Sequence, residues 1–187
     1  MARGDWIFDD GRKSVAQERI YAAAAELVAR DGYDAFNVDA LAARVHCSRA
    51  TVYRHVGGKT QIRDAVLARA SARIVDVVRS SVQGLTGARR VITAIEVAVA
   101  QIRSDPAGQL FVESAQGARG SGWLTASSEV TDLANELTGL AEDDPQAAKW
   151  IVRLVLSLLF LPDKDAHAEH RMLQRYVAPA FAGGTAT

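Results

Sequence analysis

Apolar residues recur along this chain at intervals of three and four positions, which is the period of an α-helix rather than of a strand. From Ser14 to Arg30 they fall on one stripe, and Asp31-Gly32 follows as a stop, because glycine accepts the left-handed conformation that ends helices. The stripe consists of Val15, Ile20, Ala24, Leu27 and Val28. The pattern therefore predicts a first helix over residues 14–30.

Two short helices are predicted next, on either side of a tight turn. Asn37 is a good N-cap for the first of them, because its side-chain oxygen accepts from free backbone amides. The apolar positions of that helix are Val38, Leu41, Ala42 and Val45. Ser48 is the N-cap of the second helix, which ends at Gly57-Gly58. The turn His46-Cys47-Ser48 has the length typical of a helix-turn-helix.

The pattern stays helical in the middle of the chain, with glycine and proline as interruptions. A long helix is predicted from Thr60 to about Ser81, and Gly84 and Gly87 predict a hinge or domain boundary near residues 83–88. A further helix is predicted over 88–103. Asp105-Pro106 opens the next helix, and the glycines at 117, 120 and 122 predict a loose connection before Trp123.

Two more helices are predicted for the C-terminal part. Pro145 suits the first turn of a helix over 145–161 that is apolar on nearly every face, and Pro162 ends it. The last helix is predicted over 165–182, and its apolar stripe is Met172, Leu173, Tyr176, Val177 and Phe181. The predicted fold class is all-α.

Composition narrows the class of protein. The 187 residues are 49% hydrophobic with 22 basic and 22 acidic side chains, which excludes fibrous and disordered chains. A lone Cys47 excludes a disulfide scaffold, and the start of the chain shows no export signal, so we expect a cytoplasmic protein. The longest apolar run, 150–162, is too short to span a membrane, and it contains Arg153.

Positive charge is concentrated around the predicted turn. The stretch from Ala40 to Arg63 contains no acid, and its five cations are Arg44, Arg49, Arg54, Lys59 and Arg63. Such a segment favours a polyanionic partner. By charge alone, a solvated helix face without acids is an equally good interpretation.

Residues 20–67 carry a recognisable pattern: Gly32-Tyr33, a capped short helix with Leu41-Ala42, a turn, then Ser48-x-x-Thr51-Val52-Tyr53-x-His55-Val56 and Lys59. This segment resembles the N-terminal signature of the TetR family of bacterial transcriptional regulators. The chain departs from that signature at His46, where the family usually has glycine, and at Asn37, where it usually has threonine. The resemblance implies a three-helix DNA-binding module followed by a helical effector-binding and dimerisation bundle.

The resemblance also implies which residues contact DNA. The predicted DNA-contacting set is Asn37, Ser48, Arg49, Thr51, Tyr53, Arg54, His55 and Lys59. Arg49, in the first turn of the predicted recognition helix, is a candidate for a bidentate contact to guanine, with a phosphate contact equally open. Arg54 can reach bases or backbone, and the alternative for Tyr53 and His55 is packing inside the module.

No catalytic constellation is found, so we expect no enzyme, no cofactor and no metal. The pair His167 and His170 has a spacing that a metal can use, but without a third strong ligand a solvated helix face is the better interpretation. Cys47 is interpreted as a small core residue.

The C-terminal part is expected to have a separate task. The resemblance implies that the last two helices pair with those of a second subunit, and the candidate interface residues are Trp150, Leu154, Leu158, Leu173, Tyr176 and Val177. It also implies a ligand cavity between the middle helices. The candidate pocket residues are Ile95, Val99, Ile102, Phe111, Trp123, Leu154 and Leu158. Their apolar character favours a hydrophobic effector, and ordinary core packing is the alternative for both sets.

The prediction is therefore a homodimeric regulator of transcription, a repressor that binds a near-palindromic operator and is released by a small hydrophobic effector. Residues 1–60 form the DNA-binding domain, with a flexible arm over 1–13, and residues 61–187 form the ligand-binding and dimerisation domain. The alternatives are a helix-turn-helix protein that needs no ligand and, from another class, a small helical enzyme or carrier.

Overall fold

The computed structural model describes residues 5–105, 107–108, 112, 127–140 and 144–182; for 5–13, 33, 34 and 145 it describes the backbone alone. The chain divides into two compact units. Unit 1 comprises residues 1–71 with 105–110, and unit 2 comprises residues 72–104 with 111–187. The regular elements of the described residues are all α-helices, which confirms the predicted fold class.

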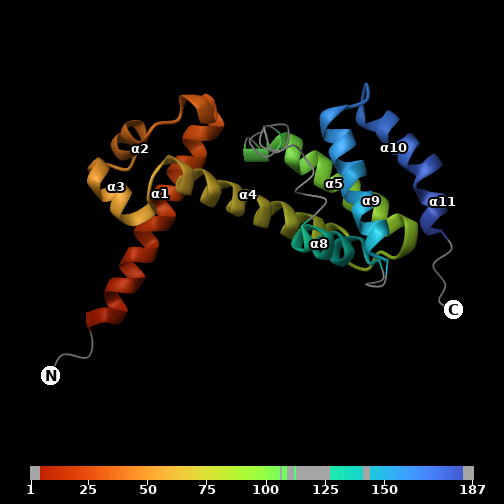
Figure 1. Ribbon diagram of the computed structural model, residues 1–187, viewed down its shortest axis with the longest axis horizontal. Helices are drawn as coiled ribbons and strands as arrows, with labels where there is room; N and C mark the ends of the chain where they lie inside the picture. The colour runs from red at the N-terminus through yellow and green to blue at the C-terminus, as the bar shows by residue number, and fades with distance from the viewer. Residues whose placement is uncertain (1–4, 106, 109–111, 113–126, 141–143, 183–187) are drawn as a thin grey trace. The chain divides into compact units, whose positions relative to one another are not determined.

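Unit 1 holds the N-terminal helices, drawn from red to yellow in Figure 1. They are α1 (Asp5–Ala35), α2 (Val38–Arg44), α3 (Arg49–Val56) and the first part of α4 (Lys59–Ser81). Helices α1, α2 and α3 pack against one another in pairs. The predicted positions of α2, α3 and α4 are confirmed, because each begins within a residue or two of the predicted start.

Helix α1 differs from its prediction at the N-terminal end. It begins at Asp5, so residues 5–13, predicted as a flexible arm, are helical; no proline in this stretch stops the helix. The predicted break at Gly32 is confirmed by its non-helical angles, φ 77° and ψ 162°. Val15, predicted to belong to the apolar stripe, is 61% exposed, because the buried positions of α1 begin at Ile20.

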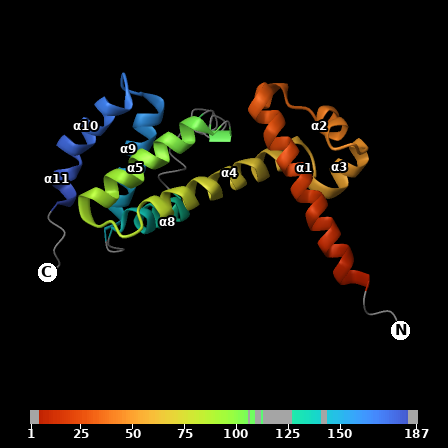
Figure 2. The same cartoon turned by 180° about the vertical axis from the view of Figure 1, so that it is seen from behind.

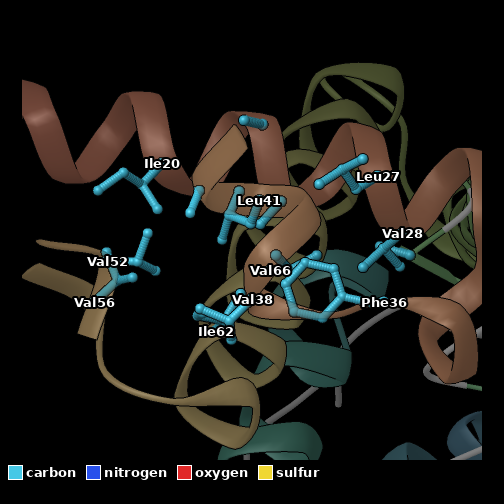
Figure 3. Close-up of a cluster of buried hydrophobic side chains, with 14 of the residues drawn as sticks. Ile20, Leu27, Val28, Phe36, Val38, Leu41, Val52, Val56, Ile62 and Val66 are labelled. Carbon is cyan, nitrogen blue, oxygen red and sulfur yellow. The ribbon is translucent and has the colours of Figure 1, made fainter. Parts of the chain in front are cut away.

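The core of unit 1 lies where α1, α2, α3 and α4 meet (Figure 3). Side chains from all four helices point into it, and Leu41, Val52 and Ile62 have no exposed surface. Its larger members are Ile20, Leu27, Val28, Phe36, Val38, Leu41, Val52, Val56, Ile62 and Val66. Burying side chains of this size stabilises the folded state by about 1.5 to 3 kcal/mol each, which is what makes so small a module rigid.

Unit 2 consists of the last part of α4, from Ala72 on, and a bundle of the remaining helices, which Figure 2 shows from behind. They are α5 (Gly87–Ser104), α8 (Ser128–Thr138), α9 (Pro145–Phe160), α10 (Ala166–Tyr176) and α11 (Ala178–Phe181). Helix α5 contacts each of the other four. Its buried face, which includes Ile92, Ile95 and Val99, packs against Ile151 and Leu158 of α9 and against Leu173 of α10. The predicted helices over 88–103 and 145–161 are confirmed, and Asp144 caps α9 through the Ala147 amide.

Helix α8 was not predicted, although the sequence contains its signals. The Ser127 side chain accepts from the amide of Val130 and begins the helix, and Gly139 ends it in the left-handed conformation with φ 69°. Arg90 of α5 then donates to the carbonyl oxygens of Glu136 and Leu137, at 2.7 and 3.0 Å, which satisfies acceptors that the end of a helix leaves open.

The predicted last helix over 165–182 is two helices, α10 and α11. Val177 lies between them, and Pro179 has no amide hydrogen to continue the ladder of α10. In the predicted stripe, Leu173 and Val177 are buried, whereas Tyr176 is 67% exposed. Pro106 and the glycine connection over 117–122 lie outside the described residues.

An ion pair with a buried carboxylate links α5, α9 and α10 of unit 2. Glu169 is 6% exposed, and both of its carboxylate oxygens accept from Arg103, at 2.8 and 2.7 Å. Arg103 also donates to the carbonyl of Leu158, at 2.8 Å, and the amide of Asp163 donates to Glu169, at 3.1 Å. The pKa of Glu169 lies below its ordinary range, chiefly because Arg103 hydrogen-bonds its ionised carboxylate.

Across the part of the chain described here, no helix combines the length and apolarity that a membrane span requires.

Candidate nucleic-acid interface

The starts of α2 and α3 are each fixed by a side-chain cap. The Asn37 side chain accepts from the amide of Ala40 at 2.8 Å, and the Ser48 side chain accepts from the amide of Thr51 at 3.1 Å, which confirms both predicted caps. Ser48 and Thr51 also share a hydrogen bond between their hydroxyls, at 2.9 Å. The start of each short helix is thus satisfied locally, because the side-chain oxygens replace missing backbone acceptors.

Helix α2 ends in a Schellman motif with histidine where glycine is usual. The amide of His46 donates to the carbonyl of Ala43, and the amide of Cys47 donates to the carbonyl of Ala42, at 3.2 and 2.9 Å. His46 has φ 56°, so it keeps the left-handed geometry that the turn requires. Cys47 packs against the core of unit 1, as predicted for a small core residue.

One side of helix α3 packs on the core of unit 1 and is hydrogen-bonded to α1. Val52 and Val56 are buried in the core, and the Gln17 side chain of α1 donates to the backbone carbonyl of His55 at 2.6 Å. His55 lies in the last turn of α3, where backbone carbonyls have no partner inside the helix, and the Gln17 side chain supplies one. One side of α3 is therefore anchored and cannot face a ligand.

The opposite side of α3 is exposed and cationic. Arg49, Ala50, Tyr53 and Arg54 are exposed, and their spacing places them on one face of the helix. Of the other predicted contact residues, Asn37 and Ser48 are exposed, and Thr51, His55 and Lys59 are half-buried. The structure thus brings the whole predicted set onto one module, within residues 37–59 of unit 1.

Lys59 is placed by a second tight turn. Gly57, with φ 79°, ends α3, and the amide of Gly58 donates to the side chain of Gln61 at 3.0 Å. Gln61 is the third residue of α4, and its side chain accepts from the amide of the residue before the helix, as in one half of a capping box. Lys59 is consequently the first residue of α4, directly after the end of α3.

Acids outside the acid-free stretch reach several of its cations. Arg44 pairs with Glu26 at 2.6 Å, Arg49 with Asp39 at 3.1 Å, and Arg63 with Asp64 at 3.0 Å. Asp39 and Asp64 directly flank the stretch, and Glu26 comes from α1. Sequence reasoning missed Asp39 and Gln17, since their partners in α3 are set by helix packing rather than by spacing.

The described members of the predicted pocket share one apolar cluster in unit 2. Ile95, Val99 and Leu158 are buried there, and Ile102 and Leu154 are partly buried against them. Phe111 and Trp123 lie outside the described residues. Assignment of these residues to a ligand site stays a prediction.

The predicted interface residues divide by exposure. Leu158, Leu173 and Val177 are buried in the core of unit 2, and Leu154 is half-buried. Trp150 of α9 and Tyr176 of α10 are 40% and 67% exposed. Trp150 packs beside the partly buried Phe181 of α11, with ring centroids 5.9 Å apart.

The histidines of α10 do not gather metal ligands. His170 Nδ1 lies 2.5 Å from a carboxylate oxygen of Glu96, and Glu169 is engaged with Arg103. Within the described residues, no cluster of three His, Cys, Asp or Glu side chains is arranged to bind a metal ion.

The chain is similar to known regulators. Residues 20–66 match the family model described as bacterial regulatory proteins, tetR family. An uncharacterized HTH-type transcriptional regulator of Mycobacterium tuberculosis (strain H37Rv) is 27% identical over 192 residues, which cover 100% of this chain and 95% of that protein. The DNA-binding transcriptional repressor TetR of Mycobacteroides abscessus is 40% identical over 48 residues, or 26% of this chain and 25% of that one.

Solved structures share the fold. The TetR family repressor AlkX from Dietzia sp. strain DQ12-45-1b has a TM-score of 0.59 at 19% identity, with 88% of this chain and 94% of that chain covered. A TetR-family transcriptional regulator from Streptomyces coelicolor has a TM-score of 0.56 at 21% identity, with 88% and 98% covered. Together with the helix-turn-helix geometry of α2 and α3, the family match identifies residues 20–66 as a DNA-binding module of the tetR family, and the solved structures show the same fold over most of the chain.

Proposed function

We propose that this regulator is a homodimeric repressor of a near-palindromic operator in the bacterial cytoplasm, and that a small hydrophobic effector releases it. In this proposal residues 1–60 bind DNA, and residues 61–187 bind the effector and form the dimer. The alternative within the same class is a regulator that dimerises but needs no ligand.

One observation carries the DNA-binding part of the proposal: the exposed face of α3 carries Arg49, Tyr53 and Arg54, and α3 contains no acid. A short helix of this kind fits the major groove, where its first turn meets base edges. Caps at both short helices and the buried Val52 and Val56 hold that face in place. Preorganisation of this kind limits the entropy lost on binding.

The surrounding residues are proposed to hold the DNA backbone. Thr51, Tyr53, His55 and Lys59 are assigned to phosphates, and Asn37 and Ser48 add contacts beside capping their helices. Lys59 at the start of α4 lies just beyond the end of α3, where a phosphate flanking the groove is expected. Contacts of this type fix register without reading sequence.

Dimerisation is proposed to use the exposed aromatic surface of unit 2. Trp150 and Tyr176 are large side chains left open to solvent on α9 and α10, and aromatic residues are enriched in protein interfaces. A symmetric dimer presents its recognition helices about 34 to 36 Å apart, or at a larger spacing in steps of the DNA turn. This geometry requires an operator with two-fold symmetry.

The effector is proposed to bind among the apolar residues of unit 2. Ile95, Val99 and Leu154 contribute no hydrogen-bonding side chains, which favours a hydrophobic ligand over a polar one. Effector binding is expected to weaken DNA binding, and DNA is expected to weaken effector binding equally, because the two are linked equilibria.

Selection of bound sequences from random duplex DNA by the full-length protein tests the proposal. We expect a motif of two inverted half-sites, affinity that falls steeply with salt, and a dimer by light scattering at micromolar concentration. Salt-independent binding or a strict monomer would contradict the operator model. A panel of apolar compounds then separates the alternatives, because a regulator without a ligand shows neither a shift in melting temperature nor release from the operator.

A further inference from the structure

The two exposed arginines of α3 differ in their partners. Arg49 forms an ion pair from its Nε atom to an Oδ atom of Asp39, at 3.1 Å, whereas Arg54 has no ion-pair partner in the described part of the chain. Both side chains of the pair are exposed, at 58% and 63%. Asp39 lies in the first turn of α2, so the pair links the two helices of the helix-turn-helix.

The contact engages Arg49 on one side only. Asp39 lies beside Nε, and the terminal nitrogens Nη1 and Nη2 donate no hydrogen bond to any described residue, so their N–H groups can bind another acceptor. Two parallel N–H groups at the end of a guanidinium match the O6 and N7 acceptors of guanine. Arg49 is thus prepared for an end-on contact with that base.

The carboxylate also disfavours the competing contact. A phosphate bound by Nη1 and Nη2 brings its negative charge close to Asp39, and like charges at such distances repel. Guanine O6 and N7 are neutral acceptors, so a guanine contact carries no such penalty. Asp39 therefore acts against a phosphate and in favour of a base, whereas Arg54 is under no comparable constraint.

We propose that Asp39 is a positioning residue that sets sequence specificity: it holds Arg49 for end-on recognition of one guanine in each half-site and leaves Arg54 for the DNA backbone. This inference rests on the proposed function, since it requires a specific operator. It assigns a role to an acid in a surface that otherwise attracts a polyanion.

The experiment measures binding of full-length variants to the selected operator, to operators with the guanine replaced by each other base, and to unrelated DNA. We expect Arg49→Ala to reduce discrimination at that guanine about tenfold, and Asp39→Ala to reduce it several-fold at the same base. Asp39→Ala should at the same time bind unrelated DNA more tightly, because a negative charge is removed from the interface. In the Arg49→Ala background, Asp39→Ala should not alter discrimination further.

Glu26→Ala is the matched control. It removes the acid that pairs with Arg44, so it changes the net charge by the same amount on the same module. We expect it to leave discrimination at the guanine unchanged. Asp39→Asn, which keeps the size of the side chain but not its charge, should behave like Asp39→Ala, and thermal unfolding of each variant confirms that the module is folded.

An operator carrying 7-deazaguanine at the same position tests the contact itself. Loss of the N7 acceptor should weaken binding by the unaltered protein but not by Arg49→Ala. The inference is overturned if Asp39→Ala keeps full discrimination, or if it loses discrimination at a different base. Failure of the unaltered protein to prefer any sequence would instead overturn the proposed function, and the two failures are thereby distinguished.

Discussion

Arg103 of α5 donates to both carboxylate oxygens of Glu169 of α10, and the acid is buried while the arginine side chain is 35% exposed. We expect Glu169→Ala to lower the free energy of unfolding by about 2 to 3 kcal/mol, below the cost of breaking a fully buried pair, because Arg103 can turn toward water. Urea unfolding at pH 7 measures the change. Glu96→Ala, which removes the partner of the more exposed His170, should cost less than about 1 kcal/mol.

The same pair makes the free energy of unfolding depend on pH. The pKa of Glu169 is lowered in the folded protein, first of all by the hydrogen bonds from Arg103, so folding favours the ionised carboxylate. Its contribution is present above the ordinary glutamate pKa of about 4.3 and is lost as the pH falls through the lowered folded value. Glu169→Gln is expected to flatten this acid-induced loss in urea titrations between about pH 5 and 2. Equal acid sensitivity in the variant and the unaltered protein would contradict the assignment.

His46→Gly is expected to stabilise unit 1 by about 0.5 kcal/mol. His46 holds φ 56° at the end of α2, and relief of that left-handed strain exceeds the entropy that glycine loses on folding. Thermal unfolding of the full chain measures the shift. Ala43→Gly makes a similar change inside α2 and should destabilise by about 1 kcal/mol, so the two substitutions are expected to have opposite signs.

Ser48→Asp separates capping from DNA binding. Aspartate caps helices about as well as serine, so we expect unfolding to change by less than about 0.5 kcal/mol. Operator affinity should fall at least tenfold, since a negative charge then faces the phosphates. Ser48→Ala is the complementary variant, with a stability loss of about 1 kcal/mol. Unchanged affinity of Ser48→Asp would remove Ser48 from the interface.

Lys59→Ala is expected to weaken binding to every DNA sequence alike and to reduce the slope of log affinity against log salt by about one unit, because one fewer counterion is released. Lys164→Ala, at an exposed position in unit 2, serves as the charge-matched control and should leave the slope unchanged. A full slope in Lys59→Ala would refute a phosphate contact at this residue.

The features that the sequence predicted correctly are local. Asn37 and Ser48 cap helices that begin one residue later, and Gly32 and Gly57 adopt positive φ where the pattern stops. Each of these depends on a side chain and on backbone atoms three or four residues away, and such distances can be read from spacing. The breaks at Gly139 and Pro179 are equally local, so the missed α8 and the split of the last helix were legible in principle.

The features that the sequence did not predict depend on which helices pack together. Arg103 and Glu169 are 66 residues apart, and neither residue alone indicates that the other is its partner. Asp39 reaches Arg49 across a turn, and Gln17 reaches the His55 carbonyl from another helix. The charged stretch around the turn was therefore found, but the acids that restrain its arginines were not.

Because α3 is short, its exposed face depends on the packing that keeps it helical. A helix of eight residues is unstable by itself in water, and α3 owes its shape to Val52, Val56 and the Gln17 bond. A peptide copied from residues 49–56 would accordingly be a poor decoy or inhibitor. Conversely, a substitution in the buried core, such as Val52→Ala, is expected to impair regulation by the protein even though the altered side chain does not contact DNA.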